Sequence, residues 1–150
     1  MVIQRWQSVL LFVAAIFMTL YSFMNLCNIE VVDNLYSFST LGIEDTVNSN
    51  TIVPSFYLFV ISILSAVLSF VAIFMYANMK LQKILCRINA ILILAIYAVT
   101  ILVVDNAFPE AHFEWRLPLS FPAIALILTF IANRLIVSDE NKLKSYDRIR

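Results

Sequence analysis

Three potential metal ligands alternate along a short segment around residue 112. Glu110, His112 and Glu114 are each separated by one residue, and an extended chain places such alternating side chains on one side. A catalytic zinc site usually takes three well-anchored ligands supported by a second shell of hydrogen bonds. This loop is short, and the chain has no other histidine. We therefore expect a solvated loop and no metal, and an enzyme built on these residues is the least favoured of three functional hypotheses.

The apolar stretches of the chain carry no ionisable residue near their middle. Arg134 comes nearest, and it lies within a turn of the end of its stretch, where its side chain can reach lipid phosphates. Proton relays, ion pathways and intramembrane proteases normally require a buried acid, histidine or arginine. Transporters also tend to break their spans with Gly or Pro, whereas here only Pro122 falls inside a stretch, where we expect it to bend the helix end. The sequence thus predicts no catalytic residue and no cofactor.

Small side chains recur along residues 55–77 at three- and four-residue spacing. One interpretation is close helix packing, with the hydroxyls bonded within or between helices. The alternative is a polar track for a substrate. Packing is favoured, because few polar residues on the other stretches are available to line such a track: Thr19, Ser22, Asn25, Thr100 and Thr129. The stripe itself consists of Ser62, Ser65, Ala66, Ser69 and Ala72.

Composition indicates a membrane protein. The 150 residues are 62% hydrophobic and 13% charged, against about a quarter charged in soluble domains. A helix needs about 20 residues to cross a hydrocarbon core of roughly 30 Å. Four stretches meet or approach this length, the third of them with help from residues 81–86. We predict an all-α membrane protein, one four-transmembrane-helix bundle over residues 1–150, with spans 8–27, 55–77, 88–104 and 118–137.

Two other readings of these stretches are less favoured. A soluble helical bundle would need a polar face on each helix, and the first three stretches carry no charge on any face. A cleaved signal peptide would have a shorter apolar region and a small-residue cleavage site. We therefore expect residues 8–27 to be a permanent helix.

Basic residues gather on one side of the predicted bundle. With the N-terminus inside, nine of the ten Lys and Arg residues are cytoplasmic, and only Arg116 lies in an outer loop, together with seven of the ten acids. Because short cytoplasmic loops are enriched in Lys and Arg, we predict that both termini are cytoplasmic. The nine residues are also our candidate contacts for a partner or for lipid: Arg5, Lys80, Lys83, Arg87, Arg134, Lys142, Lys144, Arg148 and Arg150.

The two cysteines fall at opposite ends of the predicted bundle. Cys27 follows the first stretch on the outer side, and Cys86 precedes the third on the inner side. A disulfide requires Cα atoms within about 7 Å, so these residues cannot pair within one chain. We expect both to be small packing residues.

The segments outside the spans suggest two smaller elements. Alternating Tyr, Phe and Thr in residues 35–41, followed by Gly42, favour a short β hairpin in the first outer loop, with a turn at residues 48–51. In the tail, Ser138 is suited to cap a new helix, and Glu140 and Lys144 form a favourable four-residue pair. We predict a short basic amphipathic C-terminal helix that lies on anionic headgroups or docks a cytoplasmic partner.

Several segments on the predicted cytoplasmic side resemble a known family. It comprises small four-span membrane proteins of Bacteroidota, grouped as a domain of unknown function. The resemblance covers the whole chain and implies a bacterial inner-membrane location and four helices, but no activity. The chain departs from the family's pattern at Trp6 and at Val137-Ser138. The matching segments, apart from the departure at Trp6, are Ile3-Gln4-Arg5-Trp6-Gln7, Lys80-Leu81-Gln82, Leu85-Cys86-Arg87-Ile88-Asn89, Ala132-Asn133-Arg134, Asp139-Glu140 and Ser145 through Asp147-Arg148-Ile149-Arg150.

Two non-enzymatic functions remain. The favoured hypothesis is a structural or accessory subunit that packs with a membrane or cytoplasmic partner, or with a second copy of itself, through the basic face. The alternative is a protein that handles or transports lipids or small molecules, which would need a cavity open to one side of the bundle. Equal numbers of acidic and basic residues argue against a nucleic-acid partner, whereas membrane lipids are expected partners.

Overall fold

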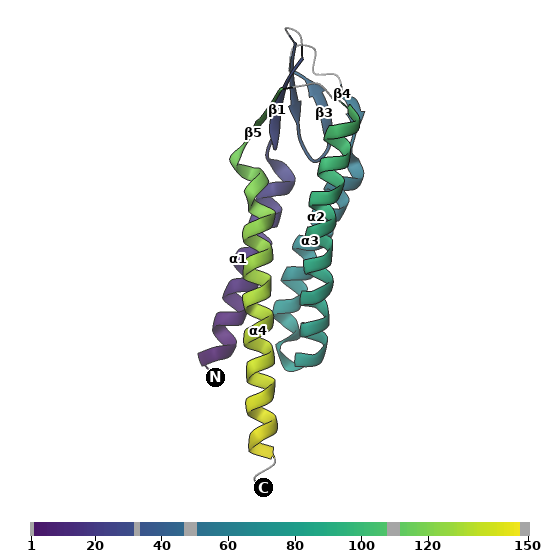
Figure 1. The fold of residues 1–150 in the computed structure, drawn as a ribbon. Helices are drawn as coiled ribbons and strands as arrows, with labels where there is room; N and C mark the ends of the chain where they lie inside the picture. The colour runs from purple at the N-terminus through teal and green to yellow at the C-terminus, as the bar shows by residue number, and fades with distance from the viewer. Residues whose placement is uncertain (1, 32–33, 47–50, 108–111, 148–150) are drawn as a thin grey trace.

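Four long helices run side by side, and a small β-sheet covers one end of them (Figure 1). The computed structural model describes residues 2–31, 34–46, 51–107 and 112–147. Both chain ends and the α2–α3 connection lie at the opposite end, which we call the terminal end; the other is the sheet end. The helices are α1 (Val2–Phe23), α2 (Phe56–Phe74), α3 (Met79–Ala107) and α4 (Phe121–Asp147), with 3₁₀ turns η1 (Met75–Ala77) and η2 (Leu117–Ser120).

All four helices are long and apolar enough to cross a membrane. Their outward faces carry large apolar side chains, such as Phe12, which is 50% exposed, and Ile91, which is 66% exposed. Soluble monomers rarely expose apolar patches of this extent. These helices suggest a membrane protein, and the prediction of four helices of this kind is confirmed.

Most observed helix ends differ from the predicted span ends, and two of the differences change the structure. The first span was expected to reach residue 27, but α1 ends at Phe23 and Cys27 already belongs to a strand. The expected separate tail helix is wrong, because α4 runs unbroken from Phe121 to Asp147 and Ser138 lies inside it. Asp139 and Glu140 have partners on neighbouring helices, so tertiary contacts override the local capping signal. By contrast, α3 begins at Met79, as the expected extension into residues 81–86 requires.

Buried residues recur along every helix at alternating spacings of four and three. This is the seam of a left-handed helical bundle, in which a and d positions interlock. The seams of α2 and α4 consist mainly of small residues, whereas the seams of α1 and α3 contain larger ones. Each helix packs against the helices before and after it in a closed ring, so a small-residue seam always contacts a large-residue seam. The seams are Gln7, Leu11, Ala14, Met18 and Tyr21; Leu58, Ser62, Ser65, Ser69 and Ala72; Gln82, Cys86, Asn89, Ile93, Ile96, Thr100 and Val103; and Ala125, Thr129, Ala132, Ile136 and Asp139.

The sheet is larger than the predicted hairpin. It has five antiparallel strands in the order β4-β3-β2-β1-β5. The first four come from the first loop of the sheet end, and the fifth comes from the loop before α4, which therefore is not a free solvated segment over residues 112–115. The turn expected at residues 48–51 lies outside the described residues except for Thr51, which is in a strand. The strands are β1 (Cys27–Val31), β2 (Asn34–Phe38), β3 (Gly42–Asp45), β4 (Thr51–Pro54) and β5 (His112–Trp115).

One face of the sheet shares its core with the bundle. Ile29, Phe38 and Ile43 are fully buried, one each on β1, β2 and β3, and they cluster with Leu58 of α2 and Val104 of α3. Successive residues of a strand point to opposite faces of the sheet, and the strand register places Ile29, Phe38 and Ile43 on the same face. The sheet therefore closes one end of the bundle and shares a buried cluster with it.

Gly42 allows β3 and β4 to approach closely. Its φ is +157°, and a Cβ atom at this position would lie 2.6 Å from the carbonyl oxygen of Val53. That oxygen is backbone of the paired strand β4 and cannot rotate away. Only glycine fits here without moving a strand.

We predict that Gly42→Ala destabilises the protein by about 2 kcal/mol, because the new methyl group must displace a paired strand. Thermal unfolding in detergent micelles, followed by circular dichroism, measures the effect. Leu41→Ala, in the exposed part of the same turn, is the control and should change the midpoint little. Equal midpoints for the two variants would contradict the packing argument.

Both cysteines are buried and free, at opposite ends of the bundle, which confirms that they form no disulfide with each other.

Burial raises the pKa of the Cys27 thiol to about 11, so almost none of it is thiolate at neutral pH. We predict that the folded protein resists maleimide at pH 7 and that labelling of Cys27 accelerates as the pH rises toward 11. Intact mass with and without denaturation measures this, and rapid labelling of the folded protein at pH 7 would refute it.

Candidate functional site

The predicted contact residues are divided among several environments at the terminal end. Lys83 pairs with Glu140, and the Lys142 ammonium lies 4.0 Å from an Asp139 carboxylate oxygen. Arg134 is exposed and stacks 5.1 Å from the ring centre of Phe130. Of the remaining candidates, Lys80 and Arg87 are exposed, the side chains of Arg5 and Lys144 are not among those described, and Arg148 and Arg150 lie outside the described residues.

Two side-chain bonds attach the end of α4 to its neighbours. The Gln7 amide of α1 donates to Asp139 at 2.5 Å, and both residues are buried. The Lys83 ammonium of α3 donates to Glu140, on the next position of α4. Their side chains are only 20% and 13% exposed, so water screens this pair less than a surface ion pair. Gln7 and Asp139 are among the residues that carry the family resemblance, but their bond to each other was not predicted from the sequence, although both fall on the seam spacing.

The stripe of small residues on α2 packs against α1 and α3 and is hydrogen-bonded to both. The hydroxyl of Ser65 donates to the Asn89 side-chain oxygen at 2.6 Å, and the Asn89 amide donates to Ser69 at 2.8 Å. Nearer the sheet end, Ser22 of α1 donates to Ser62 at 2.8 Å. All five residues are buried. These contacts confirm the packing interpretation of the stripe, with Asn89 as a partner that sequence reasoning missed.

Other polar contacts complete the bundle near the sheet. The hydroxyls of Tyr21 and Thr100 lie 3.2 Å apart, joining α1 to α3 across the ring. On α3, the Tyr97 hydroxyl donates to the Leu119 carbonyl and accepts from the Ala123 amide. Every helix is thus hydrogen-bonded to a neighbour through side chains, and these groups are already paired rather than free to bind a substrate.

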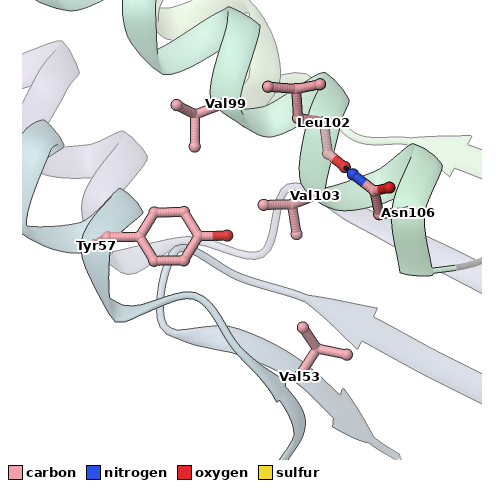
Figure 2. Close-up of a pocket in the computed structure, with 6 residues that line it drawn as sticks. All are labelled: Val53, Tyr57, Val99, Leu102, Val103 and Asn106. Carbon is pink, nitrogen blue, oxygen red and sulfur yellow. Dashed lines mark hydrogen bonds between the residues drawn. The ribbon is translucent and has the colours of Figure 1, made fainter.

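Among the pockets formed by the described residues, three lie on the flanks of the bundle. The first, of about 360 Å³, lies between α2, α3 and β4. Figure 2 shows the Tyr57 ring pointing toward Val103, and the Asn106 amide bonded to the Leu102 carbonyl at 2.7 Å. A second, of about 520 Å³, lies where α1 ends and η2 begins. A third, of about 300 Å³, is an apolar groove between α1 and α2.

The alternating Glu110, His112 and Glu114 are only partly described. Glu110 lies outside the described residues, and the other two belong to β5, where Glu30 and Asn28 of β1 are their respective partners in the ladder. Glu114 is exposed. Among the described residues, no group of three or more potential ligands lies close enough to hold a metal ion.

One protein-family model matches nearly the whole chain. The model of a domain of unknown function, DUF4293, matches residues 3–149. The chain belongs to the DUF4293 family. No curated protein matches the chain. The family assignment that the terminal residues suggested is therefore confirmed at the level of the family. Because the match runs from α1 to the end of α4, the sheet and the extended α4 lie within the DUF4293 region.

We predict that Asn89→Ala destabilises this DUF4293 protein by about 1 kcal/mol, the usual scale for an interhelical hydrogen bond in a membrane protein. Unfolding in mixed micelles of increasing sodium dodecyl sulfate fraction measures the loss. Ile91→Ala, at an exposed position of the same helix, is the matched control and should cost less.

A double-mutant cycle with Ser65→Ala tests the contact itself. If Ser65 and Asn89 interact as described, the double variant loses less stability than the two single losses combined. Strict additivity would show that the pair contributes no coupling energy.

Proposed function

We propose that this protein is a structural or accessory subunit of the bacterial inner membrane, with four crossings and both termini cytoplasmic. The proposed orientation is supported by the charges, since nine of ten basic residues belong to the segments at or near the terminal end and such residues favour the cytoplasm. The aromatic side chains of Trp6 and Tyr76 at that end, and of Tyr57 and Trp115 at the other, are exposed. Trp and Tyr are enriched at both interfaces of a bilayer.

The projecting end of α4 carries the proposal. Figure 1 shows α4 extending past the other three helices into the space beyond the terminal end. Gln7 and Lys83 brace it at Asp139 and Glu140, so the following turns start from a fixed position. A pre-positioned helix loses less entropy on binding than a flexible tail, which suits a docking element for a cytoplasmic partner.

The alternative of lipid or small-molecule transport receives less support from this bundle. A translocation path would need a cavity along the bundle axis. In the described part of the chain, the seam residues that face this axis are buried, and the polar ones among them are hydrogen-bonded. The three pockets lie on the flanks. Packing against a partner requires no such path.

Neutralising the projecting segment should separate partner binding from insertion. We predict that replacing Lys142, Lys144, Arg148 and Arg150 together with Gln reduces partner copurification and binding to anionic vesicles, while carbonate extraction still leaves the protein in the membrane. If the variant fails to insert, the main role of these residues is to set the orientation of the helices in the membrane, as the positive-inside rule describes.

Site-specific crosslinking provides the direct test of the docking surface. A photoreactive residue at Ser145, exposed on the projecting part of α4, should give one discrete adduct in native membranes. The same probe at Ser120, exposed at the sheet end, is the control and should not give that adduct. No adduct from Ser145, or the same product from both positions, would refute the proposal.

A further inference from the structure

The pocket between the end of α1 and η2 combines one cation with apolar walls. Its volume is about 520 Å³, and the residues that line it come from two segments that are distant in sequence. These segments lie where the first and fourth apolar spans end at the sheet, since one span runs to Phe23 and the other starts at Leu117. In the proposed topology, this is the boundary between hydrocarbon and headgroups. The lining residues are Phe23, Met24, Asn25, Arg116, Leu117 and Pro118.

One backbone hydrogen bond joins the two segments that form this pocket, and a second one lies within the turn that contains Arg116. The Arg116 amide donates to the Leu26 carbonyl at 2.9 Å, and the Leu119 amide donates to the Arg116 carbonyl at 3.1 Å. The first bond continues the pairing of β5 with β1, in which Trp115 faces Cys27. The pocket is therefore built into the fold, and a ligand would not have to assemble it.

Arg116 is the single basic residue of the loops at the sheet end. It is exposed, and its guanidinium forms no ion pair within the described part of the chain. Guanidinium groups bind phosphate oxygens through two parallel hydrogen bonds. Beside it, Leu117 is 75% exposed and Phe23 is 71% exposed. These large apolar surfaces add nothing to the binding of a free phosphate, but they match an acyl chain.

We propose that this pocket binds a glycerophospholipid of the leaflet on the sheet side, with its phosphate on Arg116 and its acyl chains along Phe23 and Leu117. Charge complementarity selects the phosphate, and the apolar walls select a lipid over inorganic phosphate. The proposal goes beyond the docking function of α4 and uses the opposite end of the bundle. It rests on membrane insertion, which carbonate extraction tests independently.

The experiment uses the full chain, purified in a mild detergent and titrated with dioleoyl phosphatidylglycerol or dioleoyl phosphatidylethanolamine. Native mass spectrometry counts the retained lipids. We expect Arg116→Gln to weaken the tightest binding step about tenfold, as the loss of a charge-assisted hydrogen bond implies, and Arg116→Lys to weaken it less. Leu117→Ala should also weaken it, because it removes part of the acyl-chain wall. Inorganic phosphate should not compete.

Glu114 provides a control of opposite sign. It is exposed two residues before Arg116, so Glu114→Gln should leave phospholipid binding unchanged or strengthen it. If Arg116→Gln retains lipid like the unaltered chain, or if Glu114→Gln weakens binding equally, the proposal is wrong. Competition by inorganic phosphate would assign the site to a free anion instead. Thermal unfolding of each variant verifies the fold, and Leu117→Ala tests the same site should Arg116→Gln fail to fold.

Discussion

A helix surrounded by lipid gains little by turning an apolar face inward, because the hydrocarbon outside is equally apolar. In the membrane location that we propose, the bundle is therefore held by close contact and by hydrogen bonds between helices. Both are found on the seams: Ala125 and Ala132 of α4 and the serines of α2 are small and buried, so the larger side chains of α1 and α3 can fit against them. Asn89 supplies bonds to two of those serines. The position of the sheet and of the projecting α4 depends on this packing.

The two ends of the bundle are fixed by different means. At the sheet end, backbone pairing of β1 with β5 joins the segment after α1 to the segment before α4, and β4 leads directly into α2. At the terminal end, α4 is held by the buried apolar cluster that contains Leu11, Ala132 and Ile136, and beyond it by side-chain bonds from Gln7 and from Lys83. Ladder hydrogen bonds in a shared core open only with the whole structure, whereas side-chain contacts at a helix end can break locally. The projecting turns of α4 therefore depend for their position on the bonds from Gln7 and Lys83.

The sequence was informative where one segment alone decides the structure and failed where distant segments meet. Hydropathy located four helices because length and apolar content are local properties. The four residues of β5 contain no local sign of their pairing with β1. At Ser138, the capping pattern was sound locally, but partners for Asp139 and Glu140 on other helices continue α4 through it. Asn89 was missed because a seam cannot be distinguished by hydropathy when the outer face is apolar too.

The charge pattern combines two constraints of different origin. In the proposed orientation nine basic residues belong to the cytoplasmic side, as the positive-inside rule favours. In the same proposed orientation Arg116 is the exception, because it belongs to an outer loop. Its place is set by local structure instead: it continues β5, its amide is bonded to Leu26, and its guanidinium faces no acid within 4 Å among the described residues. This fixed position, at the end of a helical span, is what the proposed phospholipid contact requires of Arg116.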